Sequence, residues 1–165
     1  MIGISKNSVI LYPFSQEWSL LFEQEKSNLY NTIGDYVIDL QHVGSTSIKD
    51  MPSKPIIDIV VGLKNFNDGF KLIDKIQTLG YNFKGSLGNN NRFFFWKGSK
   101  DNNTYNLHLT QYGDENWNNQ VLFRDFINSH PDYKDKYLKL KMDLSGKYKE
   151  DRTTYTQKNV SLLLI

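Results

Sequence analysis

Hydrophobic residues recur along the first half of the chain with two different periods. Between Ser15, a favourable N-cap residue, and Gly34, apolar side chains return every three or four residues, which predicts a helix with one buried side. Residues 36–43 alternate between apolar and polar, and residues 56–63 are almost continuously apolar. These patterns predict two strands, the second interior to a sheet because both of its faces are apolar. Residues 70–79 predict a second amphipathic helix.

The second half of the chain adds two more strands and a helical end. Residues 93–96 and 104–111 predict strands joined by a polar hairpin, and the loop-like stretch 85–91 precedes them. From Glu115 onward the apolar spacing becomes that of helices. The predicted stripes are Val121, Leu122, Phe126 and Ile127 before the break at His130-Pro131, and Tyr133, Tyr137, Leu140 and Leu144 after it. The last segment, 155–165, is helical in outline, and its apolar end is expected to dock on the body of the domain.

Composition narrows the class of protein. The 165 residues are enough for one core, so the patterns predict a single α+β domain over residues 1–165, with a mixed sheet flanked by helices and a C-terminal helical cap. A net charge of +2 argues against nucleic-acid or membrane binding. No stretch approaches the roughly 20 apolar residues that span a bilayer. The absence of cysteine excludes thiolate chemistry and fits a cytoplasmic protein.

The stretch 42–63 contains the strongest candidate for chemistry. Its first strand breaks into the turn Gly44-Ser45-Thr46-Ser47, and small residues in such a turn let backbone N–H groups approach an anion closely. Asp58 is the one carboxylate in the following apolar strand, where an ionised group needs cations or hydrogen-bond donors beside it. Together they predict a phosphate-binding turn that faces a metal ligand. The alternative is an ordinary loop between core strands, with Asp58 merely hydrogen-bonded.

Several separated motifs resemble one known family. The pair Gly44-Ser45, followed after a twelve-residue spacer by Asp58 between isoleucines, resembles the signature of the nucleotidyltransferase superfamily. More narrowly, the chain from about Val9 to its end is similar to the GrpB family, a group of small bacterial proteins that share the nucleotidyltransferase fold. The segments that carry this likeness are YPFSQEWSLLFEQE, HVGSTS, KPIIDIVVGL, RFFFWK, LHL, FRDF and HPD. The resemblance implies a nucleotide or another phosphorylated small molecule as ligand.

The carboxylates that this superfamily uses for metal binding are incomplete here. The resemblance implies three acids, two alternating on one strand and a third on a neighbouring strand. Residues i and i+2 share a strand face, so Asp58 should be partnered by residue 60, which is Val60. On the later strand Asn106 and His108 share a face, and neither is an acid. The resemblance therefore implies at most one Mg²⁺, held by Asp58, with water and phosphate oxygens completing its shell.

Two histidines and several cations complete the candidate site. His42 and His108 occupy strand positions within the family motifs, where a neutral imidazole can ligate a metal or act as a general base. The alternative for each is a core histidine bonded to a backbone carbonyl. Arg92 and Lys97 bracket an aromatic strand on opposite faces, and the resemblance favours Arg92 as the one that points into the cleft. Lys54 precedes the Asp58 strand, where its ammonium can reach a phosphate.

Cations near the C-terminus are candidates for a basic rim over the site. They are Arg124, Lys141, Arg152 and Lys158. Arg152, Tyr155 and Lys158 are spaced by three, which predicts one helical face. The alternative for each is a solvated surface charge. The candidate phosphate-binding residues are His42, Gly44, Ser45, Thr46, Lys54, Arg92, Arg152 and Lys158.

Two functions of different classes follow from these patterns. The first is a nucleotidyltransferase that binds a nucleotide or phosphorylated small molecule at the Gly44-Ser45 turn and transfers a nucleotidyl group, with one Mg²⁺ on Asp58 and with His108 as a catalytic residue. The alternative is a non-catalytic ligand-binding or accessory module that has kept the turn and lost the metal triad. The number of carboxylates near Asp58 in space separates the two, because a single acid favours binding without turnover.

Overall fold

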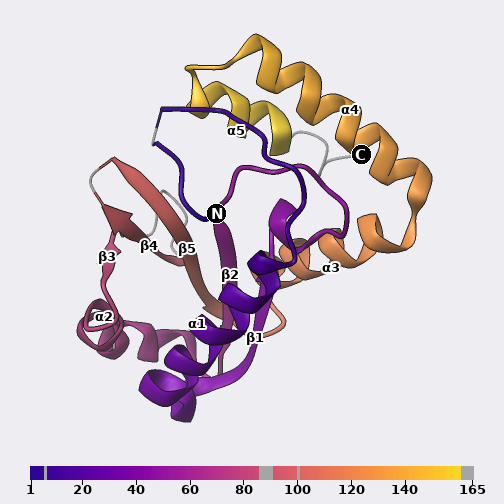
Figure 1. Ribbon diagram of the computed structural model, residues 1–165. Coiled ribbons are helices and arrows are strands. Elements are labelled where there is room, and N and C mark those ends of the chain that lie inside the picture. Colours follow the sequence, from indigo (N-terminus) through magenta and orange to yellow (C-terminus); the bar gives the residue numbers. More distant parts are fainter. Residues whose placement is uncertain (6, 86–90, 100, 161–165) are drawn as a thin grey trace.

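The computed structural model describes residues 1–5, 7–85, 91–99 and 101–160 (Figure 1). Most of the loop predicted at 85–91 and the apolar end of the last segment, 161–165, lie outside the described residues. Within the described part of the chain, no helix combines the length and the apolar character needed to cross a membrane.

One five-stranded mixed sheet organises the fold. Its strands are β1 Val37–Val43, β2 Ile57–Leu63, β3 Tyr81–Phe83, β4 Phe93–Ser99 and β5 Asn102–Gln111. The spatial order is β1-β2-β5-β4-β3; β2 and β5 run parallel, and the other neighbours run antiparallel. Strand β2 is interior, as its apolar faces predict. Strand β3 was not predicted, because three residues are too few to show an alternation.

Five helices and three short 3₁₀ turns connect and cover the strands in the described residues. The helices are α1 Glu17–Ile33, α2 Gly69–Gln77, α3 Glu115–Ser129, α4 Pro131–Lys147 and α5 Arg152–Val160. The 3₁₀ turns are Gly34–Tyr36, Ser45–Ser47 and Phe66–Asp68. Ser15 lies one residue before the N-cap of α1, and its Oγ accepts a hydrogen bond from the Glu17 amide at 3.2 Å. Pro131 begins α4, where its missing N–H has no helical acceptor.

The two faces of the sheet have different covers, and the alternation of β2 assigns each residue to one of them. Ile57, Ile59 and Val61 are fully buried in the main core, which α1 and α2 complete. Val60 points to the opposite face and packs with Trp117 of α3. Asp58 shares that second face with Val60, so the sheet presents its one β2 carboxylate away from the main core.

Helices α4 and α5 form the predicted C-terminal cap and lie together across the molecule from α1 and α2 (Figure 1). Ile48 and Met51, in the connection from β1 to β2, are fully buried against Tyr137 of α4. Tyr155 of α5 packs with Val9 of the N-terminal segment. The cap therefore holds the turn after β1 in place and closes the space over the second face of the sheet.

Only some of the residues in the apolar stripes predicted for α3 and α4 are buried. Leu122 and Phe126 of α3 are 62% and 40% exposed, and Tyr133 of α4 is 45% exposed. The helices bury Trp117, which the predicted stripes did not include, together with Ile127, Tyr137 and Leu144, which they did. A helix with apolar residues on several sides can dock in more than one orientation, and packing against the sheet selected this one.

Candidate functional site

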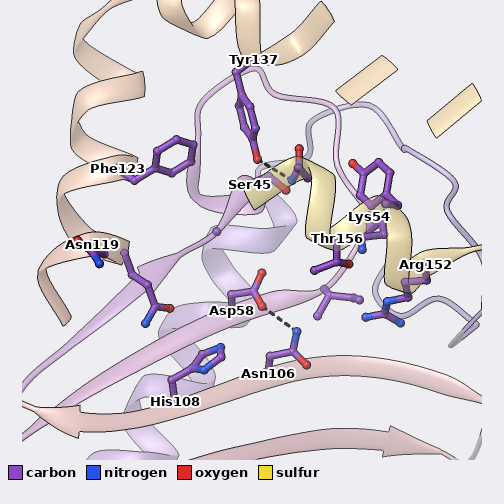
Figure 2. Close-up of a pocket in the computed structure, with 15 residues that line it drawn as sticks. Ser45, Lys54, Asp58, Asn106, His108, Asn119, Phe123, Tyr137, Arg152 and Thr156 are labelled. Atoms are coloured by element: carbon purple, nitrogen blue, oxygen red, sulfur yellow. Dashed lines mark hydrogen bonds between the residues drawn. The ribbon is translucent and has the colours of Figure 1, made fainter. Parts of the chain in front are cut away.

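A pocket of about 280 Å³ lies between the second face of the sheet and helices α3, α4 and α5 (Figure 2). Asp58 of β2 and Asn106 and His108 of β5 form its floor. The other described lining residues are Gly44, Ser45, Lys54, Ile56, Asn119, Gln120, Phe123, Tyr137, Arg152, Tyr155, Thr156 and Asn159. The structure thus brings together six of the predicted site residues: Gly44, Ser45, Lys54, Asp58, His108 and Arg152.

The turn after β1 lies directly against the Asp58 carboxylate, as the sequence predicted. Gly44 has φ +69°, a conformation that L side chains rarely adopt, and a Cβ at this position would overlap Asp58 Oδ2. On its other side, Asp58 Oδ1 accepts a hydrogen bond from Asn106 Nδ2 at 2.8 Å. Burial raises the pKa of Asp58, while the Asn106 bond and the charges of Lys54, Arg152 and Lys141 oppose that rise.

Three cations from three separate segments surround this carboxylate. The Lys54 ammonium lies 4.8 Å from the Tyr155 ring centroid, and Arg152 begins α5 beside it. Lys141 of α4 is 1% exposed, and its Nζ donates a hydrogen bond to Ser53 Oγ at 3.1 Å. None of the ion pairs closer than 4.0 Å in the described residues includes Asp58 or any of these cations. The site therefore holds more positive than negative charge.

The depressed pKa values of the two lysines follow from this arrangement. Burial and then the charge of Arg152 lower the pKa of Lys54 to about 8. Burial and then the charge of Lys54 lower the pKa of Lys141 to about 7. The charge of Asp58 raises the pKa of both lysines, but this one carboxylate does not offset the effects of burial and of the neighbouring cations.

His108 is neutral on the pocket floor. Burial and then the charge of Arg92 lower its pKa to about 3, and its ring lies 5.0 Å from that of Phe94. Its Nδ1 has no hydrogen-bond partner among the described residues. An imidazole with such a low pKa is a weak base near neutral pH, so the geometry favours a hydrogen-bonding role. Its predicted catalytic role stays a prediction.

His42 and Thr46 support the turn from behind and do not line the pocket. Thr46 Oγ1 donates to the Ile56 carbonyl at 3.0 Å, so His42 Nε2–H is the donor in its 3.0 Å bond to Thr46 Oγ1. The His42 ring stacks on Phe22 with centroids 4.9 Å apart. Burial and then the charge of Arg124 lower the pKa of His42 to about 4. His42 is therefore a satisfied core histidine, but its partner is the Thr46 hydroxyl and not the backbone carbonyl that the predicted alternative named.

Arg92 lies outside the pocket lining. Its charge acts on His108, and its Nε is buried without a partner among the described residues. Lys97, predicted to point to the opposite face, pairs there with Glu25 of α1.

Arg124 and Lys158 also lie outside the lining. Arg124 donates to the His42 carbonyl at 2.7 Å and so ties α3 to β1. Lys158 lies over the Tyr148 ring at 5.9 Å. With about 3.6 residues per helical turn, Asn159 rather than Lys158 returns to the face of Arg152.

Several lining residues carry no clear signal in the sequence. Asn119, Gln120 and Phe123 come from α3, and Tyr137 comes from α4. Asn159 Nδ2 donates to the Tyr137 hydroxyl at 3.1 Å, and burial raises the pKa of that hydroxyl to about 12. The one available signal is the spacing of four between Arg152 and Thr156 and of three to Asn159, which marks one face of α5.

The residues around Asp58 do not fit a resident Mg²⁺. The described residues contain no group of three His, Cys, Asp or Glu side chains placed to hold a metal. Val60 is fully buried where a second acid would stand, and Asn106 replaces the third and occupies one Asp58 oxygen. The nearest charged side chains are cations, which repel a divalent cation.

Comparisons with known proteins place these observations in a family. The GrpB protein family profile matches residues 8–163. The glutamate-rich protein GrpB of Alkalihalophilus pseudofirmus is 37% identical, over 94% of this chain and 92% of that protein. The protein YqkA of Bacillus subtilis is 31% identical, over 92% of this chain and 43% of that protein.

Solved structures agree with the sequence relatives. The conserved protein GrpB from Enterococcus faecalis superimposes with a TM-score of 0.83 at 23% identity, over 94% of this chain and 98% of that one. Cid1 in complex with the UTP analog UMPNPP gives a TM-score of 0.53 at 11% identity, over 81% of this chain and 42% of that one. At these identities the likeness shows the fold alone, which is nucleotidyltransferase-like, as predicted. The profile match and the relative that is 37% identical over almost its whole length show that the chain belongs to the GrpB family.

Proposed function

We propose that this protein binds a phosphorylated small molecule in the pocket over Asp58 and holds its phosphate with Lys54 and Arg152, without a resident metal ion. The observation that carries the proposal is the excess of buried positive charge, because three cations surround one carboxylate and none forms a direct ion pair in the described residues. Buried charge without a counter-charge is unfavourable, and an anionic ligand supplies that counter-charge.

Of the two functions expected from the sequence, this geometry favours the binding module. Nucleotidyl transfer relies on divalent cations to neutralise the phosphates. Here Lys54 and Arg152 supply that positive charge, and Val60 and Asn106 stand where the missing acids would be. The fold likeness to Cid1, which was solved in complex with a UTP analog, supports a nucleotide or nucleotide-like phosphate as one form of the ligand.

Thermal unfolding with a panel of phosphorylated compounds tests the proposal. A ligand at 100 times its dissociation constant adds about 2.7 kcal/mol to the free energy of unfolding. We expect such a shift without Mg²⁺, and we expect Arg152→Gln and Lys54→Gln to reduce it. Lys158→Gln is the matched control, since it removes a cation from the same helix outside the pocket. If none of the phosphorylated compounds shifts the unfolding transition, the proposal is overturned.

The substitution Asp58→Asn distinguishes the two functions, because each predicts a change in ligand binding of the opposite direction. Asparagine keeps an oxygen that can accept the Asn106 bond, but it removes the negative charge that repels a bound phosphate. We expect metal-free binding to tighten about tenfold. If Asp58 instead holds Mg²⁺ for nucleotidyl transfer, the same substitution abolishes a shift that requires both metal and triphosphate.

A further inference from the structure

Two lining side chains carry buried polar atoms with no partner among the described residues: His108 Nδ1 and Asn159 Oδ1. Asn159 Nδ2 is already bonded to Tyr137, which leaves Oδ1 as an acceptor without a donor. Such atoms are rare in folded proteins because leaving them unpaired is unfavourable. Both side chains line the same pocket, and their unpaired atoms are covered in the ligand-free protein, so pairing with the hydroxyl groups of a ligand requires these side chains to turn toward it.

The charge of the site sets the charge of the ligand. When ionised, Lys54, Lys141 and Arg152 exceed the one charge of Asp58 by two positive charges. A phosphate monoester carries about 1.5 to 2 negative charges at pH 7, which matches that excess. A triphosphate carries more charge and normally brings a divalent cation with it.

The size of the pocket limits the rest of the ligand. Its volume of about 280 Å³ is just below the roughly 300–1,000 Å³ of pockets that enclose drug-sized ligands. Lys54 and Arg152 lie on one side, and His108 and Asn119 lie on the other (Figure 2). Asp58 lies between them, with one oxygen bonded to Asn106 and the other turned toward the cavity. A phosphate therefore fits at the cationic side, and a short neutral body fits beside the carboxylate.

We infer that the ligand is a small hydroxylated phosphate monoester of the sugar-phosphate class. Its phosphate binds Lys54 and Arg152, and its hydroxyl groups pair with Asp58, Asn159 Oδ1 and His108 Nδ1. This inference rests on the proposed function and narrows it, because it names hydroxyl groups as the second recognition element. In this inference His108 and Asn159 recognise the hydroxyl groups of the ligand, and Lys54 and Arg152 bind its phosphate.

Isothermal titration of the full chain with matched probes tests this inference without altering the protein. Ribose 5-phosphate has both elements, propyl phosphate lacks the hydroxyl groups, and ribose lacks the phosphate. We expect ribose 5-phosphate to bind at least tenfold more tightly than propyl phosphate, as two or more hydrogen bonds of ordinary strength imply. ATP, with or without Mg²⁺, is expected to bind more weakly than ribose 5-phosphate.

Variants then assign the effect to residues. His108→Leu and Asn159→Leu should weaken the binding of ribose 5-phosphate more than that of propyl phosphate, and so reduce the preference between the two. His108→Gln, which keeps hydrogen-bonding groups, should retain part of the preference, whereas a purely structural role would make both His108 variants weaken both probes. Lys158→Gln is the control outside the pocket.

Each outcome separates the inference from the proposed function. Equal binding of the two esters, or tighter binding of ATP, overturns the inference and leaves phosphate binding in place. Binding of ribose as tight as ribose 5-phosphate overturns both, and so does the failure of every phosphorylated probe to bind.

Discussion

Both faces of the sheet hold lysine side chains that are partly or fully buried, and the faces differ in how those charges are paired. On the face covered by α1, Lys97 Nζ donates to both Glu25 oxygens, at 2.9 and 3.1 Å, and lies over the rings of Tyr81 and Tyr105. On the face covered by the helical cap, Lys54 and Lys141 have no ion pair of that kind in the described residues. The first face is complete as a folded core, and we propose that a ligand completes the second.

The comparison shows why a buried cation is not by itself evidence for a site. A lysine with a carboxylate in contact stabilises the packing of a strand on a helix. A lysine whose nearest carboxylate is shared with other cations stores an unfavourable charge, which an anion can relieve. Substitutions on each face should therefore have opposite effects on the ligand-free protein.

The largest expected effect is a loss of stability from a substitution on the face covered by α1. Glu25→Gln should lower the free energy of unfolding by about 3 kcal/mol, because it leaves the Lys97 ammonium without its counter-charge. Urea unfolding followed by circular dichroism measures this change. Glu23→Gln, on the exposed side of the same helix, is the control and should change stability by less than about 0.5 kcal/mol. Equal losses in the two variants would contradict the assigned ion pair.

A smaller effect of the opposite sign is expected on the ligand face. Lys141→Met should raise the free energy of unfolding of the ligand-free protein by about 1 kcal/mol, because it removes a buried cation without a contacting carboxylate. The same variant should bind phosphate esters more weakly. Lys139→Met, exposed on the same helix, is the control. A variant that is both less stable and unchanged in binding would show that Lys141 is a structural residue only.

The smallest expected effect is a dependence of the free energy of unfolding on pH. Unfolded Lys141 keeps its proton up to its ordinary pKa of 10.5, while folded Lys141 releases it near 7. Between these values the unfolded state binds more protons, so the contribution of this lysine to the free energy of unfolding rises with pH. The stability gained by Lys141→Met should therefore be largest near pH 6 and shrink toward pH 9.

Ligand binding should show the reverse trend. Lys54 and Lys141 lose their protons as the pH rises through about 8 and about 7, so the affinity for phosphate esters falls over that range. Urea titrations and calorimetry at the two pH values measure both trends. Parallel pH trends in stability and affinity would contradict the assignment of these lysines to the site.

The strands and the family were predictable because their signals are local. The continuous apolar run of β2 places it inside the sheet, and the period of two assigns Asp58 to the face opposite Ile57 and Ile59. The departure at Val60 and Asn106 was also visible in the sequence, and Asp58 is the one acid among the described residues that line the pocket. The helical side of the pocket was less predictable, as the exposed Leu122 and Phe126 show.

By itself the sequence determined the two faces of the sheet and the presence of Val60 and Asn106 where two acids were expected, since the period of two fixes which residues of a strand share a face. Only the tertiary structure decided that Lys54, Lys141 and Arg152 converge on the Asp58 carboxylate and that Asn119, Gln120 and Phe123 of α3 line the pocket beside it. The physical reason is that a strand fixes side-chain direction within two residues, whereas the side that a helix presents depends on how its whole surface packs against distant parts of the chain.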